Sequence, residues 1–452
     1  ACMAPSESSD VHEVDAHEAN EADACEMDSP ATHVSDMAMA LRAPRRWPPS
    51  ARAVAAALLC HSVGVVLVGA FCGARALSMP DGTGPVLHIA PERVALLVSG
   101  AGKLATVLAR DPSERLRACV HWHRGQIVGP ESIVASANGS LFALDRVGWL
   151  HRADPSADGA YKLAPAIAYV GPGRPLGAEL DADRLRIADS LKGLTELELP
   201  SGRLAVLSNG AAYVNDLATD ASGRVYFTSS TREPVELTRV PAGQKPFYDT
   251  MGAYLRTMAR GDATGRLLRY NPETFQTDEL LGGLWFANGV ALAAGGEFAL
   301  VVETLGLRVL RLWLTGPKAG AVESFAAALP GLPDGISRSA DGETFWLAII
   351  APWTPLLKLL KFRMLRGLLA RVLPVVLRFV KPIGLVLRLR ASDGALVDVL
   401  ADASGSHVSS VSAVTEAADG RLLLGQLMGD SLVVCPRVDE PAACRSESAE
   451  VA

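Results

Sequence analysis

The sequence predicts an all-β fold, a six-bladed β-propeller, with an N-terminal transmembrane helix and two inserts, the second of them helical. Six short Gly-containing turns recur between residues 131 and 435, and each is followed by an apolar or aromatic strand. A second strand begins 9 to 12 residues after four of these turns and 42 residues after the third and fifth. Without this extra length each unit has about 40 residues, the size of a four-stranded blade. A sandwich or barrel is the alternative, but neither requires six equivalent units.

The six turns lie at 138–142, 182–185, 222–227, 295–298, 341–346 and 419–422. The extra residues, 231–262 and 350–383, interrupt the same strand connection in two different blades. Connections of one kind emerge on one face of a propeller. We therefore expect both inserts to lie over the end of the axis where the inner strands begin, and to shape access to a site there.

The chain divides into five segments. Residues 1–52 form an acidic tail, expected to be cytosolic and largely disordered, whose first 41 positions hold ten Asp or Glu and no Lys or Arg. Residues 53–73 are 21 uncharged and mostly apolar residues, long enough to cross a bilayer as a transmembrane signal anchor. Residues 74–128 are a juxtamembrane segment with a strand that closes a blade. The propeller occupies 129–436, and 437–452 is a second disordered tail.

The charges that flank residues 53–73 predict the orientation of the chain. Four arginines precede this segment, at 42, 45, 46 and 52, and only Arg75 follows it before Arg93. The positive-inside rule then places the N-terminus in the cytosol. A cleaved signal peptide is the alternative, but some fifty residues before the apolar segment are too many for one. We expect a single-pass type II protein of the endoplasmic reticulum or plasma membrane, with the propeller on the lumenal or extracellular side. Asn138-Gly139-Ser140 would then be a glycosylation sequon.

Composition excludes one class of partner. The formal net charge is −6, and the ten acids of the first 41 residues account for more than this excess. The rest of the chain is near neutral, which argues against nucleic-acid binding. The oligomeric state is not indicated by the sequence.

Seven cysteines are spread along the chain without zinc-ligand spacing. In an oxidising lumen Cys119, Cys435 and Cys444 could supply one disulfide, and the sequence does not choose the pair. Buried free thiols are the alternative.

Polar side chains recur at one phase of the repeat, seven or eight positions before a turn. They are Glu131, Asn215, Asn288 and Asp334. Because inner strands of a propeller begin near its axis, these four side chains should converge. Two carboxylates and two carboxamides are oxygen ligands suited to Ca²⁺, with Mg²⁺ and Mn²⁺ as less favoured alternatives. The alternative is that Asn and Asp simply cap turns where strands begin.

Several segments resemble the strictosidine synthase-like family. They are 129–132 (GPES), 173–177 (GRPLG), 215–217 (NDL), 225–230 (VYFTSS), 265–272 (GRLLRYNP), 286–290 (FANGV) and 329–335 (LPGLPDG). The resemblance covers roughly residues 85–435 and, with the type II anchor, is similar to the adipocyte plasma membrane-associated protein branch. It extends distantly to the paraoxonase and gluconolactonase group. The resemblance implies that the four residues selected by phase are Ca²⁺ ligands.

Three departures from the family pattern bear on function. The catalytic Glu of strictosidine synthase corresponds to Ala413, and a methyl group cannot transfer a proton. The paraoxonase His corresponds to Leu176, and the family's frequent Cys before Gly173 is Pro172, which argues against the usual disulfide.

These residues favour a Ca²⁺-dependent esterase or lactonase acting on small or lipophilic substrates. Asp334 is the candidate base for activating water, and Asp216 is a second candidate. A non-enzymatic, metal-stabilised scaffold that binds lipid or protein is the alternative, and amine-aldehyde condensation is least favoured. Within the second insert, residues 352–382 combine apolar and basic residues, which favours contact with a membrane or lipid substrate over a packed lid.

Overall fold

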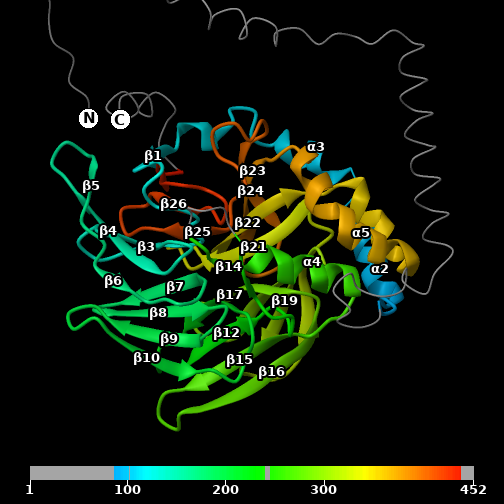
Figure 1. Ribbon diagram of the computed structural model, residues 1–452, viewed down its shortest axis with the longest axis horizontal. Helices are drawn as coiled ribbons and strands as arrows, with labels where there is room; N and C mark the ends of the chain where they lie inside the picture. Colours follow the sequence, from blue (N-terminus) through cyan, green and yellow to red (C-terminus); the bar gives the residue numbers. More distant parts are fainter. Residues whose placement is uncertain (1–85, 101, 240–244, 439–452) are drawn as a thin grey trace, which may run out of the picture. The chain divides into compact units, whose positions relative to one another are not determined.

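Six antiparallel sheets surround a central axis in the computed structural model, which describes residues 86–100, 102–239 and 245–438 (Figure 1). The predicted six-bladed β-propeller is confirmed. The sheets, each written from its innermost strand outward, follow one another along the chain.

The first two blades are β2 (Ile133–Ala135), β3 (Leu141–Leu144), β4 (Trp149–Pro155) and β5 (Tyr161–Leu163), with β6 (Ala168–Tyr169) also on β4, and then β7 (Pro175–Asp181), β8 (Arg184–Asp189), β9 (Gly193–Glu198) and β10 (Arg203–Ser208). The third and fourth are β11 (Val214–Thr219), β12 (Val225–Ser229), β15 (Gly265–Asn271) and β16 (Gln276–Leu284), and β17 (Ala287–Leu292), β18 (Phe298–Glu303), β19 (Arg308–Trp313) and β20 (Val322–Ala327). The last two are β21 (Gly331–Arg338), β22 (Thr344–Pro352), β23 (Gly384–Arg390) and β24 (Leu396–Asp402), and β25 (Ala413–Glu416), β26 (Leu422–Gly425), β27 (Leu432–Cys435) and β1 (Val120–Trp122).

The two ends of the propeller meet in the sixth blade. Its outermost strand, β1, precedes the first blade in the chain and pairs antiparallel with β27, Val120 opposite Val434. A disulfide joins Cys119 to Cys435 across the same pair of strands. The ring of blades is thus closed by hydrogen bonds and by a covalent bond. Of the cysteines left open by the sequence, these two form the pair.

Apolar residues of neighbouring blades fill the space between the sheets. Between the fourth and fifth blades, for example, Leu300, Phe345 and Leu347 are fully buried in one cluster. Because both faces of each blade pack against a neighbour, the strands read as apolar runs with little alternation, as in β18, which is buried at all six positions.

The inner strands share a local irregularity. The ladder between the first and second strands shifts register in four consecutive blades, between Pro175 and Ala178, Val214 and Leu217, Ala287 and Val290, and Pro333 and Ile336. A bulge bends a strand and re-aims a side chain. In three of these blades the bulge holds one of the polar residues selected by phase.

The two inserts each contain a helix. The first carries β13 (Glu236–Leu237), β14 (Tyr248–Asp249) and α4 (Thr250–Arg260), and the second carries the 3₁₀ turn η3 (Pro355–Lys361), α5 (Arg363–Val376) and η4 (Leu377–Phe379). Helix α4 begins where the Asp249 carboxylate accepts a hydrogen bond from the Met251 amide at 2.9 Å, and ends at Gly261 with a φ of +76°. Before the propeller come α2 (Pro91–Ser99), α3 (Lys103–Leu108) and η2 (Arg115–Ala118).

Helices α2, α4 and α5 lie close together at the edge of the sheets (Figure 1). Leu97 of α2, Leu255 of α4 and Leu373 of α5 are buried in one apolar cluster, which also contains Phe286 at the start of the fourth blade. The inserts are therefore anchored on the propeller through this cluster.

No helix among the described residues is long and apolar enough to cross a membrane. The anchor predicted for 53–73, the acidic tail of 1–52 and nearly all of the C-terminal tail lie outside the described residues.

Candidate functional site

Glu131, Asn215, Asn288 and Asp334 line a single pocket of about 340 Å³. They come from the first, third, fourth and fifth blades, and each is at most 6% exposed. The structure thus brings together the four residues that share one phase of the repeat. Side chains separated by up to about two hundred positions in the sequence meet here because the inner strands begin around one axis.

Glycines in the bulges allow the inner strands to approach closely at this point. A Cβ on Gly335 would lie 2.6 Å from the Ser412 carbonyl oxygen, and one on Gly289 would lie 2.4 Å from the Ile336 amide nitrogen. Neither neighbour is a flexible side chain, so larger residues would force the strands apart. This contact explains the glycine at position 335.

The Glu131 loop is held by the sixth blade. The Gln426 amide donates to the Pro130 carbonyl at 2.7 Å, and the Ser412 hydroxyl donates to the Glu131 carbonyl at 2.8 Å. These bonds fix the backbone of Glu131, while its carboxylate faces the pocket. The sixth blade therefore positions a site residue without supplying a charged one.

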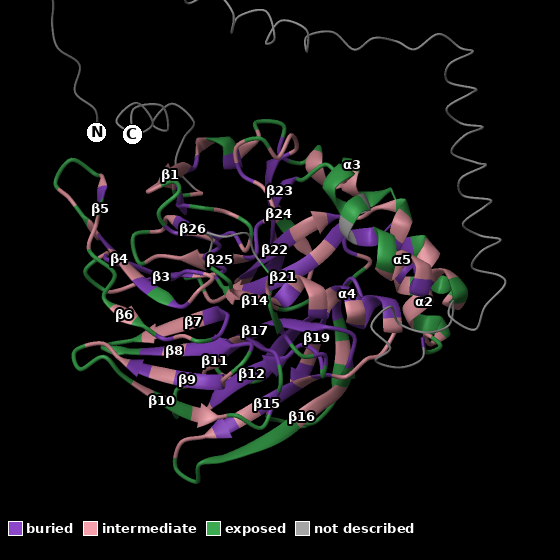
Figure 2. Cartoon of the chain, in the orientation of Figure 1, coloured by how far each residue is buried: buried purple, intermediate pink, exposed green. Residues whose placement is uncertain are grey.

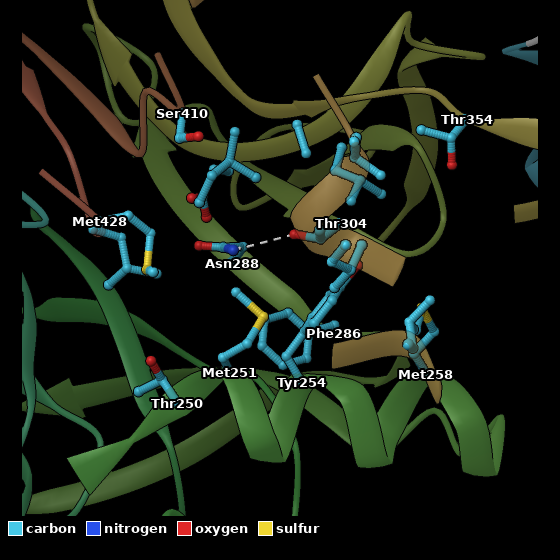
Figure 3. Close-up of a pocket in the computed structure, with 18 of the residues that line it drawn as sticks. Thr250, Met251, Tyr254, Met258, Phe286, Asn288, Thr304, Thr354, Ser410 and Met428 are labelled. Atoms are coloured by element: carbon cyan, nitrogen blue, oxygen red, sulfur yellow. Dashed lines mark hydrogen bonds between the residues drawn. The ribbon is translucent and has the colours of Figure 1, made fainter. Parts of the chain in front are cut away.

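A hydroxyl group orients Asn288. Its side-chain amide donates to Oγ1 of Thr304 at 3.1 Å, and Thr304 in turn donates to the Pro333 carbonyl at 2.8 Å (Figure 3). With its NH₂ group committed to Thr304, the carboxamide oxygen of Asn288 is left for another partner. No sequence pattern pointed to Thr304, because a threonine at the end of a buried strand is unremarkable by itself.

Burial and mutual repulsion perturb the acids. Burial, reinforced by the charge of Asp216, raises the pKa of Asp334 to about 8 against the opposing effect of the Asn288 side chain. Burial and then the charge of Asp334 raise the pKa of Glu131 well above its usual range, while the buried Arg174 opposes this shift. Because the charges of these two buried carboxylates repel each other, the pair favours protonation or a shared cation.

The donor set fits a hard cation. The Oδ1 atom of Asn215 is buried and has no hydrogen-bond partner among the described residues. An orphaned buried acceptor costs free energy unless something else binds it, and a cation would do so. No group of three or more His, Cys, Asp and Glu side chains capable of holding a metal is present in the described part of the chain. The set here instead pairs two carboxylates with two carboxamides, which suits Ca²⁺.

Most of the pocket wall above these four residues is apolar. Met251, Tyr254 and Met258 reach in from α4 (Figure 3), and Leu357 and Leu373 come from the second insert. The Tyr254 ring packs edge-on against Phe286, with ring centres 5.1 Å apart. Both inserts therefore cover the polar floor of the pocket. Tyr254 brings a hydroxyl into this wall, a feature that the sequence analysis missed because it assigned no helix to the first insert.

Asp216 faces a different cavity. It is adjacent to Asn215 in the chain, but the strand alternation turns it toward a second cavity of about 310 Å³ lined by the other ends of the inner strands. There its carboxylate accepts a hydrogen bond from the Val290 amide at 3.1 Å, and burial raises its pKa to about 7. Asp334 lines the first pocket and Asp216 does not.

His407 and Asn138 lie away from the pocket. Nε2 of His407 is 2.6 Å from the Cys119 carbonyl oxygen, beside the disulfide. Asn138 is exposed in the turn between β2 and β3, where its carboxamide oxygen accepts from the Ser140 amide at 3.1 Å.

Comparisons with known proteins show which families and relatives this chain resembles. The family model for strictosidine synthase matches residues 246–317, which run from the first insert to the end of β19 and include Asn288. Strictosidine synthase-like protein 10 of Arabidopsis thaliana is 34% identical over 300 residues, covering 62% of this chain and 75% of the relative. The human adipocyte plasma membrane-associated protein is 30% identical over 340 residues, covering 70% and 76%.

The chain belongs to the strictosidine synthase-like family. Among solved structures it is similar to a gluconolactonase from Xanthomonas campestris, with a TM-score of 0.47 and 18% identity over 70% of this chain and 89% of that one. It is also similar to a calcium-binding regucalcin from Agrobacterium tumefaciens, with a TM-score of 0.45 and 14% identity over 70% and 94%.

In this strictosidine synthase-like chain, the positions that correspond to the catalytic residues of related enzymes are apolar. Leu176 is buried in the apolar cluster beside Tyr213 and Phe286, and Ala413 lines the second cavity. The sixth blade contributes Ser410, Leu427 and Met428 to the pocket, none of which is an acid. The described lining residues also include no His, Lys, Arg or Cys, and their only carboxylic acids are Glu131 and Asp334.

Proposed function

We propose that this strictosidine synthase-like protein is a Ca²⁺-dependent hydrolase of lipophilic esters or lactones. The observation that carries the proposal is the convergence of Glu131, Asn215, Asn288 and Asp334 at the polar floor of an otherwise apolar pocket. The apolar wall would bind the hydrocarbon part of a substrate and exclude water around it. The floor would bind the reacting carbonyl.

The four oxygen side chains would hold the cation, with the orphaned Oδ1 of Asn215 as one donor. A cation bound there would polarise the substrate carbonyl and favour the ionised form of both acids. Asp334 would accept a proton from the attacking water and pass it to the alkoxide released when the acyl C–O bond breaks. Tyr254 of α4 would form one wall of the pocket. It would thereby restrict the size and shape of the acyl or alcohol group that can bind.

The proposal includes a membrane anchor. Residues 53–73 would hold the protein as a single-pass type II protein, with the propeller on the lumenal or extracellular side of the endoplasmic reticulum or plasma membrane. The Cys119–Cys435 disulfide supports an oxidising compartment, and Asn138 in its exposed turn would carry a glycan.

The full chain, purified in detergent, should be assayed with short and long acyl aryl esters and with lactones, with Ca²⁺ and with a chelator. We expect hydrolysis that the chelator abolishes and that Asp334→Ala reduces by about 100-fold or more. Asp393→Ala, at an exposed carboxylate in the turn after β23, is the matched control and should keep full activity. Activity that survives both the chelator and Asp334→Ala would overturn the proposal.

A non-enzymatic scaffold is the second candidate. It is favoured by Leu176 and Ala413, the apolar residues at the positions of the catalytic His and Glu of related enzymes. If the protein is inert on the whole substrate panel and Ca²⁺ still raises its thermal stability, the cation is structural and the pocket binds a ligand without turnover.

A further inference from the structure

Helix α5 and the turn η4 expose a continuous apolar stripe. Phe379 is 84% exposed, Val375 56% and Met364 44%, with Val372 and Leu377 also exposed. Positions 364, 372, 375 and 379 fall on one side of a helix, because they are separated by eight, three and four residues. We refer to Met364, Val372, Val375 and Phe379 as the α5 outer face, and Leu377 is exposed beside it.

The opposite side of α5 is also apolar. Leu369 and Leu373 line the pocket, and Leu373 is buried. Figure 2 shows buried and exposed residues side by side along this helix. A helix that covers a protein core normally presents polar residues to solvent. We therefore expect the α5 outer face to contact an apolar surface outside the protein.

The charged residues in the sequence around α5 are all of one sign. From Thr344 to Ser392 the sequence contains no Asp or Glu, whereas the second insert, 350–383, holds seven Lys or Arg. Five of these are exposed: Lys358, Lys361, Arg371, Arg378 and Lys381. Apolar residues interleaved with exposed basic ones match the interface of a bilayer with anionic headgroups.

The N-terminal part of the described chain is bound to the same helix. Nε of Arg363 donates to the Val86 carbonyl at 2.6 Å, and Arg366, buried beneath it, donates to the Leu87 carbonyl. Only 12 residues separate position 73, the end of the proposed anchor, from Val86. Twelve residues reach at most about 40 Å. A bilayer that held residues 53–73 would thus lie within that distance of Val86, which is bonded to the first residue of α5.

The rim of the pocket lies beside the α5 outer face. Leu377 and Met428 both line the pocket, and they are 37% and 73% exposed. A lipophilic molecule leaving the bilayer at η4 would therefore meet the pocket without crossing water.

We propose that the α5 outer face binds the surface of an anionic membrane and that the pocket takes its substrate from the lipid at that surface. The inference rests on the membrane anchor of the proposed function and not on hydrolysis, and the anionic headgroups that it requires would lie in the leaflet that faces the propeller. Its substrate class would be esters or lactones that partition into the bilayer. The residues of the inner strands bind the reacting group of the substrate. The second insert lines the route by which the substrate enters the pocket from the bilayer.

Hydrogen-deuterium exchange of the full chain tests the contact without turnover. The protein is placed in phosphatidylcholine nanodiscs and in nanodiscs containing 30% phosphatidylserine. We expect backbone exchange over 363–379 to slow by at least about fivefold in the anionic discs, and this effect to disappear in 1 M salt. Exchange in the β15–β16 turn, which lies at the end of the third blade away from the pocket, should be the same in both discs.

Two matched variants check the surface. Phe379→Asp removes the most exposed apolar side chain of the α5 outer face and should abolish the protection. Phe275→Asp, at a side chain that is 77% exposed in the β15–β16 turn, should leave it intact. Both residues are at the surface, so equal melting temperatures are expected and confirm that each variant is folded.

Equal exchange over 363–379 in both kinds of disc would overturn the proposal. It would equally be overturned by protection that appears in detergent and grows with protein concentration, since that result identifies a second protein copy as the occupant. A failure of hydrolysis in the ester assay leaves the exchange result unaffected, so the two proposals are tested separately.

Discussion

The side-chain amide of Asn288 lies 3.1 Å from Oγ1 of Thr304, and this bond turns the Asn288 carboxamide oxygen toward the pocket that contains Glu131 and Asp334. Both partners are buried. Thr304 is itself held by its bond to the Pro333 carbonyl, one position before Asp334. One hydroxyl thus connects the backbone of the fifth blade to a candidate ligand of the fourth.

Replacing Thr304 tests this orienting role. Thr304→Val keeps the shape but removes the hydroxyl, so we expect Ca²⁺ affinity to fall by about 10- to 100-fold, as for other groups that orient metal ligands. Isothermal titration with Ca²⁺ measures the change. Thr304→Ser retains the hydroxyl and should stay within a few-fold of the parent chain. Equal losses in both variants would contradict an orienting role for the hydroxyl.

The stabilisation of the fold by Ca²⁺ should grow with pH, while the metal-free protein becomes less stable. The pKa of Asp334 is raised to about 8 and that of Asp216 to about 7, both well above the value of about 4 in an unfolded chain. Between pH 4 and 8 the metal-free folded protein therefore holds more protons than the unfolded one, and its free energy of unfolding falls as the pH rises. Ca²⁺ requires the ionised carboxylates, so its stabilising effect grows over the same range.

Thermal unfolding at pH 5.5 and pH 8, in chelator and in Ca²⁺, measures both effects. We expect Ca²⁺ to raise the melting temperature by several degrees at pH 8 and by less at pH 5.5. Glu131→Gln should reduce the increment at pH 8. A larger increment at pH 5.5 than at pH 8 would show that the cation binds elsewhere.

Reduction of the Cys119–Cys435 disulfide should loosen the closure of the propeller. The bond joins positions 316 residues apart, so it restricts the unfolded chain strongly. Cys119→Ser and Cys435→Ser should each lower the free energy of unfolding by about 2–5 kcal/mol, and the double variant should lose no more than either alone. Denaturant unfolding under oxidising conditions measures this. Cys444→Ser is the control and should unfold like the parent chain.

Glycosylation reports the proposed orientation. Expressed in a secretory system, the full chain should carry a glycan that an endoglycosidase removes, and Asn138→Gln should abolish the resulting gel shift. Ala22→Ser completes a sequon that begins at Asn20 in the acidic tail, and this sequon should remain unmodified. A glycan at Asn20 and none at Asn138 would show the opposite orientation.

Local patterns in the sequence were sufficient to predict the propeller and its four-residue site. Glycine turns and blade-length spacing are short-range features, and the phase of Glu131, Asn215, Asn288 and Asp334 follows from counting within each repeat. Symmetry then makes equal phase equivalent to proximity, which explains why residues so far apart in the chain could be grouped.

Contacts between repeats could not be predicted in this way. Thr304 and Tyr254 carry no signal of their own, since their roles depend on Asn288 and Phe286 of other elements. The same holds for the cavities that Asn215 and Asp216 face, because each cavity is formed by residues of several blades. The choice of Cys435 over Cys444 as the partner of Cys119 likewise required the pairing of β1 with β27.

The sequence alone therefore determined the repeat, its number of blades and which oxygen atoms share one phase, because these are periodic properties of a linear chain. The tertiary structure decided which groups orient those atoms, which cavity each acid faces and how α5 divides its two apolar sides between the pocket and the exterior. These features depend on packing between separate blades and inserts, and the distances involved are set only when the ring of blades closes.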